Sequence, residues 1–161
     1  MSESRPWRIA ALVGMVAVAA QAVAIRDVLV WDDIPLLARS DLYTNAARWT
    51  ESVTSSLGRA TYYWRPVATT SFLLESLVHG GVGWGFRLTS ALMHGATSAI
   101  AFVLLLRLVG NRKAALLAAL AFALHPVNVE AVTWISARFD LMAALLSLAA
   151  LAAIPATAAR S

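Results

Sequence analysis

Four apolar runs divide the chain, and polar segments that carry most of the charges separate them. Residues 9–25 hold no charge over 17 positions, and as a helix they would be about 25 Å long, just enough to cross a hydrocarbon core. A second uncharged run covers residues 88–106, and shorter runs follow at 114–124 and 141–154. The pattern predicts about four transmembrane helices. Their approximate bounds are residues 8–26, 88–107, 114–129 and 140–156.

The first run also has features of a cleavable signal peptide. Small residues at Ala20, Ala22 and Ala24 resemble a cleavage site, so residues 1–24 could be a leader. The run is long for a leader, however, and a leader would explain none of the later apolar runs. We therefore favour a transmembrane helix.

The connection at residues 27–87 is long enough to carry its own structure. Residues 41–57 have the pattern of an amphipathic helix. Residues 67–79 follow Pro66 and predict a second helix, which is too short and too polar to span and so would lie on the membrane surface. We predict an all-α polytopic membrane bundle whose long external first loop bears short interfacial helices.

Composition supports this fold class. Hydrophobic residues make up 60% of the chain and charged residues only 14%, whereas soluble domains have about a quarter of their residues charged. A net charge of +4 in so apolar a chain fits basic membrane loops and excludes a nucleic-acid-binding protein. The chain has no cysteine, which excludes disulfides, thiolate metal sites and a cysteine nucleophile.

The distribution of charge predicts the topology. The two termini and the turn at residues 107–113 together sum to +5, whereas the connection from Arg26 to Arg87 sums to zero. The more basic side is expected to be cytoplasmic. Both termini would then lie inside and the long loop outside, in the periplasm if the plasma membrane is bacterial.

Two adjacent carboxylates, Asp32 and Asp33, stand at the head of the loop. In one interpretation Asp33 caps a helix that starts at Pro35, and Asp32 is merely solvated. In the other, one of the two acts as a base or metal ligand. Because sequence neighbours point away from each other, one catalytic and one structural carboxylate is the natural division.

Farther along the loop, Arg65 follows three aromatic residues at positions 62–64. The segment could be an interfacial aromatic belt with a snorkelling arginine. Alternatively, the planar guanidinium of Arg65 could bind a phosphate, with the rings holding a lipid or a sugar.

The third polar cluster follows the third apolar run, where Pro126 predicts a kink or an end because proline lacks an amide hydrogen. Ionisable groups at membrane depth are costly unless they are paired or functional, and Glu130 with Arg138 could be a structural pair. His94, alone on an apolar helix, is expected to hydrogen-bond to a neighbouring helix. The cluster consists of His125, Asn128, Glu130, Arg138 and Asp140.

Taken in order, these segments resemble the amino-terminal part of the GT-C class of polyprenyl-phosphate-sugar-dependent membrane glycosyltransferases. They are most similar to the transmembrane O-mannosyltransferases that carry tetratricopeptide repeats, and to their bacterial relatives. The resemblance covers about residues 28–153. It rests on Trp31-Asp32-Asp33, Trp64-Arg65-Pro66-Val67, the segment from Phe86 to His94, the segment from Ala121 to Val132, and Arg138-Phe139-Asp140-Leu141.

The resemblance implies transfer of a sugar from a polyprenyl-phosphate donor to a protein or glycan hydroxyl on the external face. Asp32 or Asp33 would act as the catalytic base or hold a divalent metal ion, which is a candidate cofactor. The leaving lipid phosphate needs positive charge, for which Arg65 and Arg138 are the candidates. His125, Glu130 and Asp140 would support the site, whether by binding substrate, by holding a metal or by fixing the helix break.

Members of this class have more spans than this chain contains. We therefore expect the chain to be one membrane module, an incomplete portion of a larger protein or a partner of a larger membrane chain, and to be inactive alone if it is truncated. The alternative is a small four-helix membrane scaffold or subunit without catalytic activity, whose polar clusters only stabilise helix ends.

Overall fold

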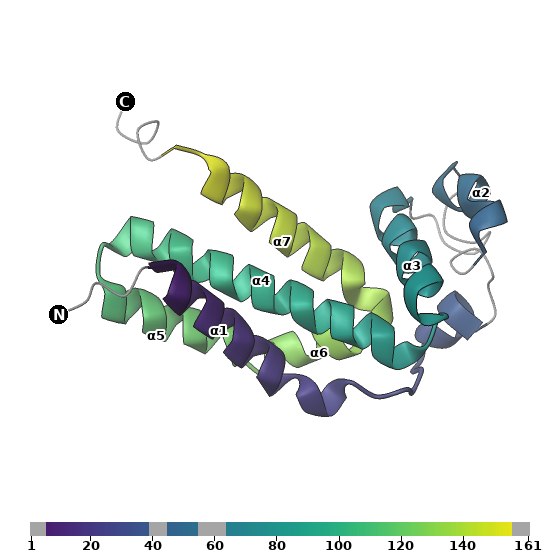
Figure 1. Ribbon diagram of the computed structural model, residues 1–161, viewed down its shortest axis with the longest axis horizontal. Helices are drawn as coiled ribbons and strands as arrows, with labels where there is room; N and C mark the ends of the chain where they lie inside the picture. The colour runs from purple at the N-terminus through teal and green to yellow at the C-terminus, as the bar shows by residue number, and fades with distance from the viewer. Residues whose placement is uncertain (1–5, 39–44, 55–63, 156–161) are drawn as a thin grey trace.

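The computed structural model describes residues 6–38, 45–54 and 64–155 of the 161-residue chain (Figure 1). These residues form helices and connections, with no strand among them. The α-helices are α1 (Pro6–Ala20), α2 (Trp49–Thr54), α3 (Pro66–His79), α4 (Gly83–Val109), α5 (Arg112–Ala123), α6 (Val127–Thr133) and α7 (Arg138–Ala153). Short 3-10 or π turns are η1 (Ala22–Ala24), η2 (Ile34–Ala38), η4 (Ala46–Arg48) and η5 (Ile135–Ala137).

Three stretches of helix are long and apolar enough to cross a membrane: Pro6–Ala24, Gly83–Val109 and Ile135–Ala153. The pair α5 and α6 passes the same test as one span that bends by 56° at its break, which brings the number to as many as four. The predicted all-α polytopic bundle is therefore confirmed, and the chain is an integral membrane protein.

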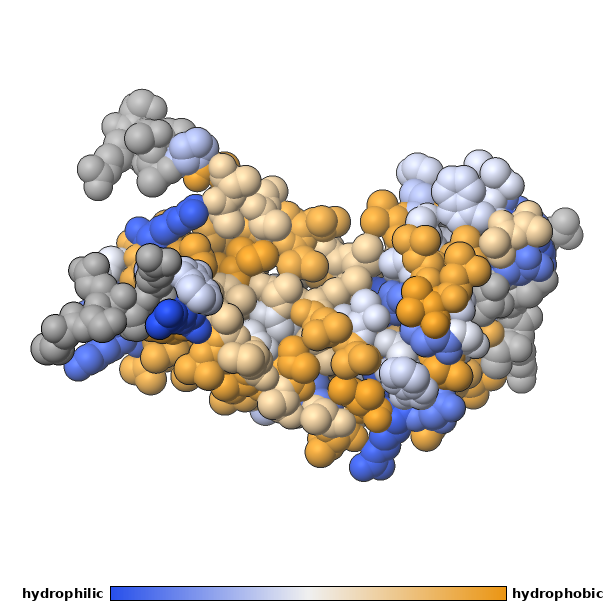
Figure 2. Space-filling view, viewed as in Figure 1, coloured by the Kyte–Doolittle hydropathy of each residue, from blue (hydrophilic) through white to orange (hydrophobic). Residues whose placement is uncertain are grey.

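The surface of the long helices has the composition expected against lipid. Figure 2 shows their faces as largely hydrophobic, while the most hydrophilic side chains gather toward the two ends of the bundle. Large apolar side chains such as Leu12, Met15 and Leu117 are more than half exposed. A water-soluble protein rarely exposes so much contiguous apolar surface, because its transfer to water is unfavourable.

Small residues let α1, α4 and α5 approach closely. Gly14 on α1 faces Gly95 on α4, and a Cβ on Gly95 would lie 2.7 Å from Val18 Cγ2 and 2.9 Å from the carbonyl oxygen of Gly14. Either contact is too short for a real side chain, so only glycine fits. Because lipid is as apolar as the core, this close backbone packing is what favours association of the helices. The buried residues of this cluster are Ala10, Val13, Ala17, Phe102, Ala115, Ala119 and Ala123.

Pro126 breaks the third span as predicted, and side chains partner the carbonyl groups that the break frees. Residue 126 has no N–H to donate to the carbonyl of Phe122, which instead accepts from Asn128 Nδ2 at 2.6 Å and from the His125 backbone N–H at 3.2 Å. The N–H of Val127 donates to His125 Nδ1 at 3.2 Å. These bonds remove the cost of unpaired backbone groups at membrane depth.

His94 stabilises the same break from the neighbouring helix. Its side chain is buried on α4, and Nε2 lies 3.0 Å from the carbonyl oxygen of Ala123 at the end of α5. Because a carbonyl only accepts, Nε2 carries the hydrogen. The predicted interhelical bond of His94 is confirmed.

The loop helices follow the predictions in part. α3 starts at Pro66 and ends where Gly80 adopts a left-handed φ of 73°. Within the helix predicted at 41–57, η4 and α2 together cover 46–54; positions 41–44 and 55–57 lie outside the described residues. α4 begins five residues earlier than predicted, where Asp27 Oδ1 accepts from the N–H of Gly83 at 2.7 Å.

The helices are arranged so that polar loop elements collect at one end (Figure 1). We use "loop end" for the end formed by η2, α3 and the starts of α4 and α7. The opposite end holds the start of α1, the turn between α4 and α5, and the end of α7. This separation agrees with the predicted topology, in which the long connection lies on one side of the membrane.

Candidate functional site

Asp33 is fully buried at the loop end and ties the loop to η5, which directly precedes α7. Its Oδ1 accepts from both the N–H and the hydroxyl of Ser136, each at 2.9 Å. Its Oδ2 accepts from the N–H of Val30 at 3.4 Å and lies 3.5 Å from Nη2 of Arg87. The interpretation that Asp33 caps a helix at Pro35 is therefore wrong, because its carboxylate bonds to Val30, Ser136 and Arg87 instead.

Arg87 is the cation that makes burial of Asp33 possible. It is 4% exposed and also donates from Nε to the carbonyl of Thr133 at 2.9 Å and from Nη1 to that of Arg26 at 2.8 Å. One guanidinium thus links the loop, α4 and α6. Pairing and full hydrogen bonding offset the cost of removing both charges from water.

Asp32, in contrast, is exposed and adjacent to a strained residue. Trp31 has a φ of 47°, a conformation that bulky side chains rarely adopt. The turn leaves the carboxylate of Asp32 open to solvent while Asp33 points inward. The pair is thus divided into one buried structural carboxylate, Asp33, and one accessible carboxylate, Asp32.

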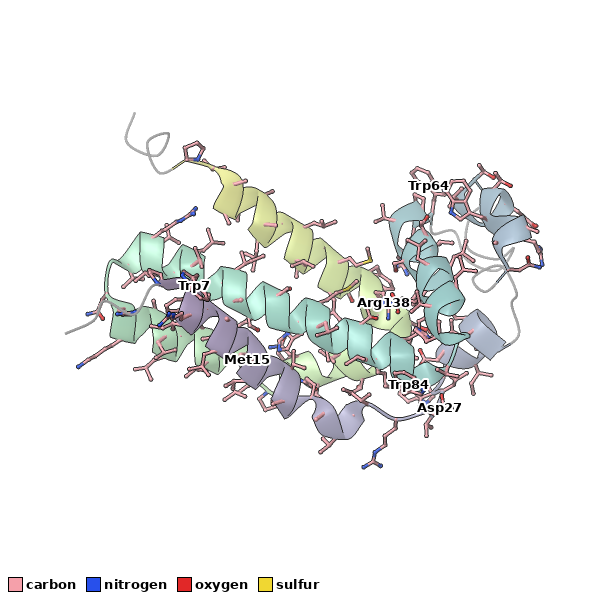
Figure 3. The ribbon with its side chains drawn as sticks, in the orientation of Figure 1. Trp7, Met15, Asp27, Trp64, Trp84 and Arg138 are labelled. Atoms are coloured by element: carbon pink, nitrogen blue, oxygen red, sulfur yellow. The ribbon has the colours of Figure 1, made fainter. Side chains whose placement is uncertain are left out.

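Arg138 lies at the centre of the contacts between α3, α4 and α7 (Figure 3). It is fully buried and pairs through Nη1 with Glu75, while Nη2 donates to the carbonyl of Phe86 at 2.5 Å. The ring of Phe72 lies 4.6 Å below the guanidinium. The suggested structural pair of Arg138 with Glu130 is wrong, because Glu75 of α3 takes that place.

These contacts also bear on the predicted role of Arg138 as a ligand of the donor phosphate. A phosphate would have to displace Glu75 and enter a closed region, since the guanidinium has no exposed surface. In this structure Arg138 is a positioning residue that docks α3 against the bundle.

His79 extends this buried polar cluster. Its Nε2 lies 3.8 Å from Glu75 Oε2, and its ring packs edge-on against Phe86 with centroids 4.9 Å apart. The ring occupies the space beside Gly85, where a Cβ would come within 2.5 Å of it. Glu75, His79 and Arg138 therefore form a cluster of three ionisable side chains where α3 packs against α4 and α7.

Arg65 lines an apolar groove between α3 and α7. Its guanidinium carbon sits 3.3 Å from the ring centroid of Phe139, which orients the planar group by a cation–π interaction. The groove has a volume of about 200 Å³. It is lined by Arg65, Pro66, Val67, Ala68, Phe139, Met142, Ala143 and Leu146. A flexible apolar chain with a charged head would match this lining.

The remaining predicted residues lie on the bundle surface near the break and on α7. His125 and Glu130 are exposed on either side of Pro126, and Asp140 is exposed in the first turn of α7. His125 stabilises the break between α5 and α6, because its Nδ1 accepts a hydrogen bond from the N–H of Val127. Glu130 and Asp140 carry acidic groups without a structural role in the contacts described above.

The residues do not form an evident metal centre. Among the residues that the structure describes, no three His, Asp or Glu side chains gather in a group that could hold an ion. Both oxygens of Asp33 already accept hydrogen bonds.

Comparison with known proteins supports the resemblance seen in the sequence. The chain is 38% identical over 81 residues to the protein O-mannosyl-transferase Tmtc2 of Drosophila melanogaster. It is 35% and 33% identical over 103 residues to the tmtc2 proteins of Xenopus laevis and Homo sapiens. The chain is a partial homologue of the protein O-mannosyl-transferases.

The similarity covers 50 to 64% of this chain but only 9 to 12% of these three curated relatives. The chain thus spans about a tenth of the length of the O-mannosyl-transferases that it matches. No family model and no solved structure matches it. The predicted resemblance is confirmed, and the activity of the longer relatives is a proposal for this chain.

Sequence reasoning missed three residues of the loop end: Glu75, His79 and Arg87. Glu75 and His79 stand among apolar and hydroxyl residues on α3, and Arg87 precedes the uncharged run of α4, so ionisable residues within apolar segments were the available signal. His79 pairs with Glu75 four positions away, whereas the partners of Arg87 and Glu75 include Thr133 and Arg138, 46 and 63 positions away. Only the tertiary structure brings them together.

Proposed function

We propose that this chain forms part of a membrane glycosyltransferase that transfers a sugar from a polyprenyl-phosphate donor to an acceptor hydroxyl outside the cytoplasm. The observation that carries the proposal is the division of the acidic pair, with Asp33 buried and Asp32 accessible. The names of the homologous O-mannosyl-transferases support mannose as the sugar and a protein as the acceptor.

The groove between α3 and α7 supports a lipid-linked donor. Its lining is apolar apart from Arg65, whose guanidinium carbon lies 3.3 Å from the ring centroid of Phe139. In the proposal, part of the polyprenyl chain lies along Met142 and Leu146, and Arg65 binds the phosphate through its planar N–H groups.

The chemical step then needs one base and one cation. The carboxylate of Asp32 takes the proton of the acceptor hydroxyl while that oxygen bonds to the anomeric carbon. The bond between the anomeric carbon and the phosphate oxygen breaks, and its electron pair stays on the lipid phosphate, whose added charge Arg65 stabilises. Asp32 afterwards returns its proton to water.

The external face is proposed to be the loop end, which carries Asp32, Arg65 and the exposed Asp140. This orientation follows from the predicted cytoplasmic side, where the basic termini lie. Arg138 and Asp33 hold α3 and the loop in position and do not touch substrate. Inactivity of the chain on its own, if the native protein is longer, belongs to the same proposal.

Paired variants test the role of Asp32. In the protein encoded by the whole reading frame, Asp32→Asn should keep the fold and lower transfer of labelled mannose from polyprenyl-phosphate mannose by more than about 100-fold. Asp33→Asn should instead lower stability in detergent, because it removes the partner of Arg87. Equal transfer by wild type and Asp32→Asn would overturn the catalytic role.

A binding assay separates this proposal from a scaffold without activity. Labelled polyprenyl phosphate should bind to the wild-type protein and bind at least tenfold more weakly to Arg65→Ala, with Arg48→Ala as a surface control. Absence of lipid-phosphate binding, together with specific co-purification of a larger membrane partner, would favour the scaffold.

A further inference from the structure

The turn before Asp32 exposes a tryptophan in a conformation that is unfavourable for it. Trp31 has a φ of 47° and is 81% exposed, which makes it the most exposed of the six tryptophans. Left-handed backbone at a bulky residue persists only where the surroundings enforce it, and such residues cluster at functional sites. Burial does not explain this one, because most of the indole is in solvent.

A second tryptophan stands beside it. The ring of Trp134, between α6 and η5, meets that of Trp31 edge to face, with centroids 6.2 Å apart and planes at 88°. The indole Nε1 of Trp134 has no hydrogen-bond partner in the described structure. The two indoles come from segments about a hundred positions apart in sequence.

The carboxylate of Asp33 holds this pair in place. It closes the turn by accepting from the N–H of Val30, and it accepts two bonds from Ser136, two residues after Trp134. The turn is closed from the other side too, because the N–H of Asp33 donates to the carbonyl of Val30 at 2.9 Å. The hydrogen bonds of the buried Asp33 carboxylate thus hold the segments that carry the two indoles and the exposed carboxylate of Asp32.

The chemistry of the surface favours a carbohydrate. An indole face is electron-rich and attracts the polarised C–H bonds of a pyranose ring, while a carboxylate accepts hydrogen bonds from its hydroxyl groups. Anchoring in the membrane interface would not require the unfavourable φ, and Trp7 at the opposite end is 57% exposed on an ordinary helix.

We propose that Trp31, braced by Trp134, is the stacking surface for the hexose ring of the sugar that is transferred beside Asp32. This inference rests on the proposed function for the identity of the sugar. The inference goes beyond the proposed function by assigning binding of the sugar ring to the aromatic pair.

Saturation-transfer NMR with methyl α-mannoside tests the contact without needing activity. The full-length protein in detergent should transfer magnetisation to the ring C–H groups of the sugar. Trp31→Asn should abolish the effect or weaken binding at least tenfold, Trp31→Phe should retain part of it, and Trp7→Ala should leave it unchanged. Tetramethylammonium serves as a cationic probe of the same surface.

The choice of asparagine makes the test independent of folding. Asparagine tolerates the left-handed conformation better than tryptophan does, so the thermal midpoint of Trp31→Asn should equal or exceed that of the wild type. A lower midpoint would give Trp31 a packing role and overturn the proposal. Absence of mannoside contact in the wild type, or Trp31-dependent binding of tetramethylammonium in place of the sugar, would also overturn it.

The same experiment separates this inference from the proposed function. A protein that transfers mannose but contacts mannoside independently of Trp31 would retain the function and refute the stacking surface. A protein without transfer whose mannoside contact depends on Trp31 would retain the stacking surface and refute the function.

Discussion

The middle of the bundle and its loop end are stabilised by different kinds of contact. In the middle, α1, α4 and α5 meet through glycine and alanine, and Gly14 and Gly95 touch backbone to backbone. At the loop end, the buried carboxylate of Asp33 pairs with Arg87, and the partly buried carboxylate of Glu75 pairs with Arg138. Close packing suffices where both helices remain surrounded by lipid, whereas a polar loop must be fixed by directional bonds.

The difference also separates structure from chemistry at the loop end. The carboxylate of Asp33 and the guanidinium groups of Arg87 and Arg138 that hold it together are buried, whereas Asp32 is exposed and Arg65 lines the groove; in the proposed function these last two meet the substrate. A buried frame that positions a few accessible groups is what a preorganised site requires.

Removal of Arg138 should have the largest effect. Arg138→Met would leave Glu75 without its cation in a largely buried position, and unpaired buried charges cost about 3–5 kcal/mol. We expect the free energy of unfolding, measured by denaturant titration in mixed micelles, to fall by about 3 kcal/mol. The double variant with Glu75→Gln should recover more than half of the loss. A loss of similar size in the double variant would show that Glu75 is not the relevant partner.

A bulkier residue at the glycine contact should have an intermediate effect. Gly95→Val would force its side chain against the Gly14 carbonyl and Val18, and overpacking of this kind costs about 1–3 kcal/mol. The control is Ala96→Val, which adds the same branched side chain on the exposed face of α4. The same assay should separate the two variants by about 2 kcal/mol. Equal stabilities would mean that α1 and α4 do not depend on this contact.

The smallest effect is expected at the break between α5 and α6. Asn128→Ala would remove the 2.6 Å bond from Nδ2 to the carbonyl of Phe122, leaving this carbonyl to backbone N–H donors such as that of His125 at 3.2 Å. Side-chain hydrogen bonds within membranes average about 0.6 kcal/mol, so the loss should be of that order. Hydrogen exchange at α6 should increase, while exchange at α1 stays unchanged. Unchanged exchange at α6 would mean that Pro126 alone determines the bend.

The sequence determined the features that depend on local composition. Runs of apolar residues predicted the spans, Pro66 and Pro126 the start of α3 and the break of the third span, and the lone His94 an interhelical bond. Each of these follows from residues near one another in the chain, because helix length, proline geometry and the cost of an isolated polar group are local properties.

Only the tertiary structure decided which charges pair. Arg138 bonds to Glu75, 63 positions away and not to the nearer Glu130, and Asp33 reaches Ser136 across 103 positions. Neither distance along the chain nor residue type distinguishes Asp32 from Asp33, yet one is exposed and the other buried. Burial of a charge depends on which partners the folded helices bring within hydrogen-bond distance, and that is set by packing between segments distant in sequence.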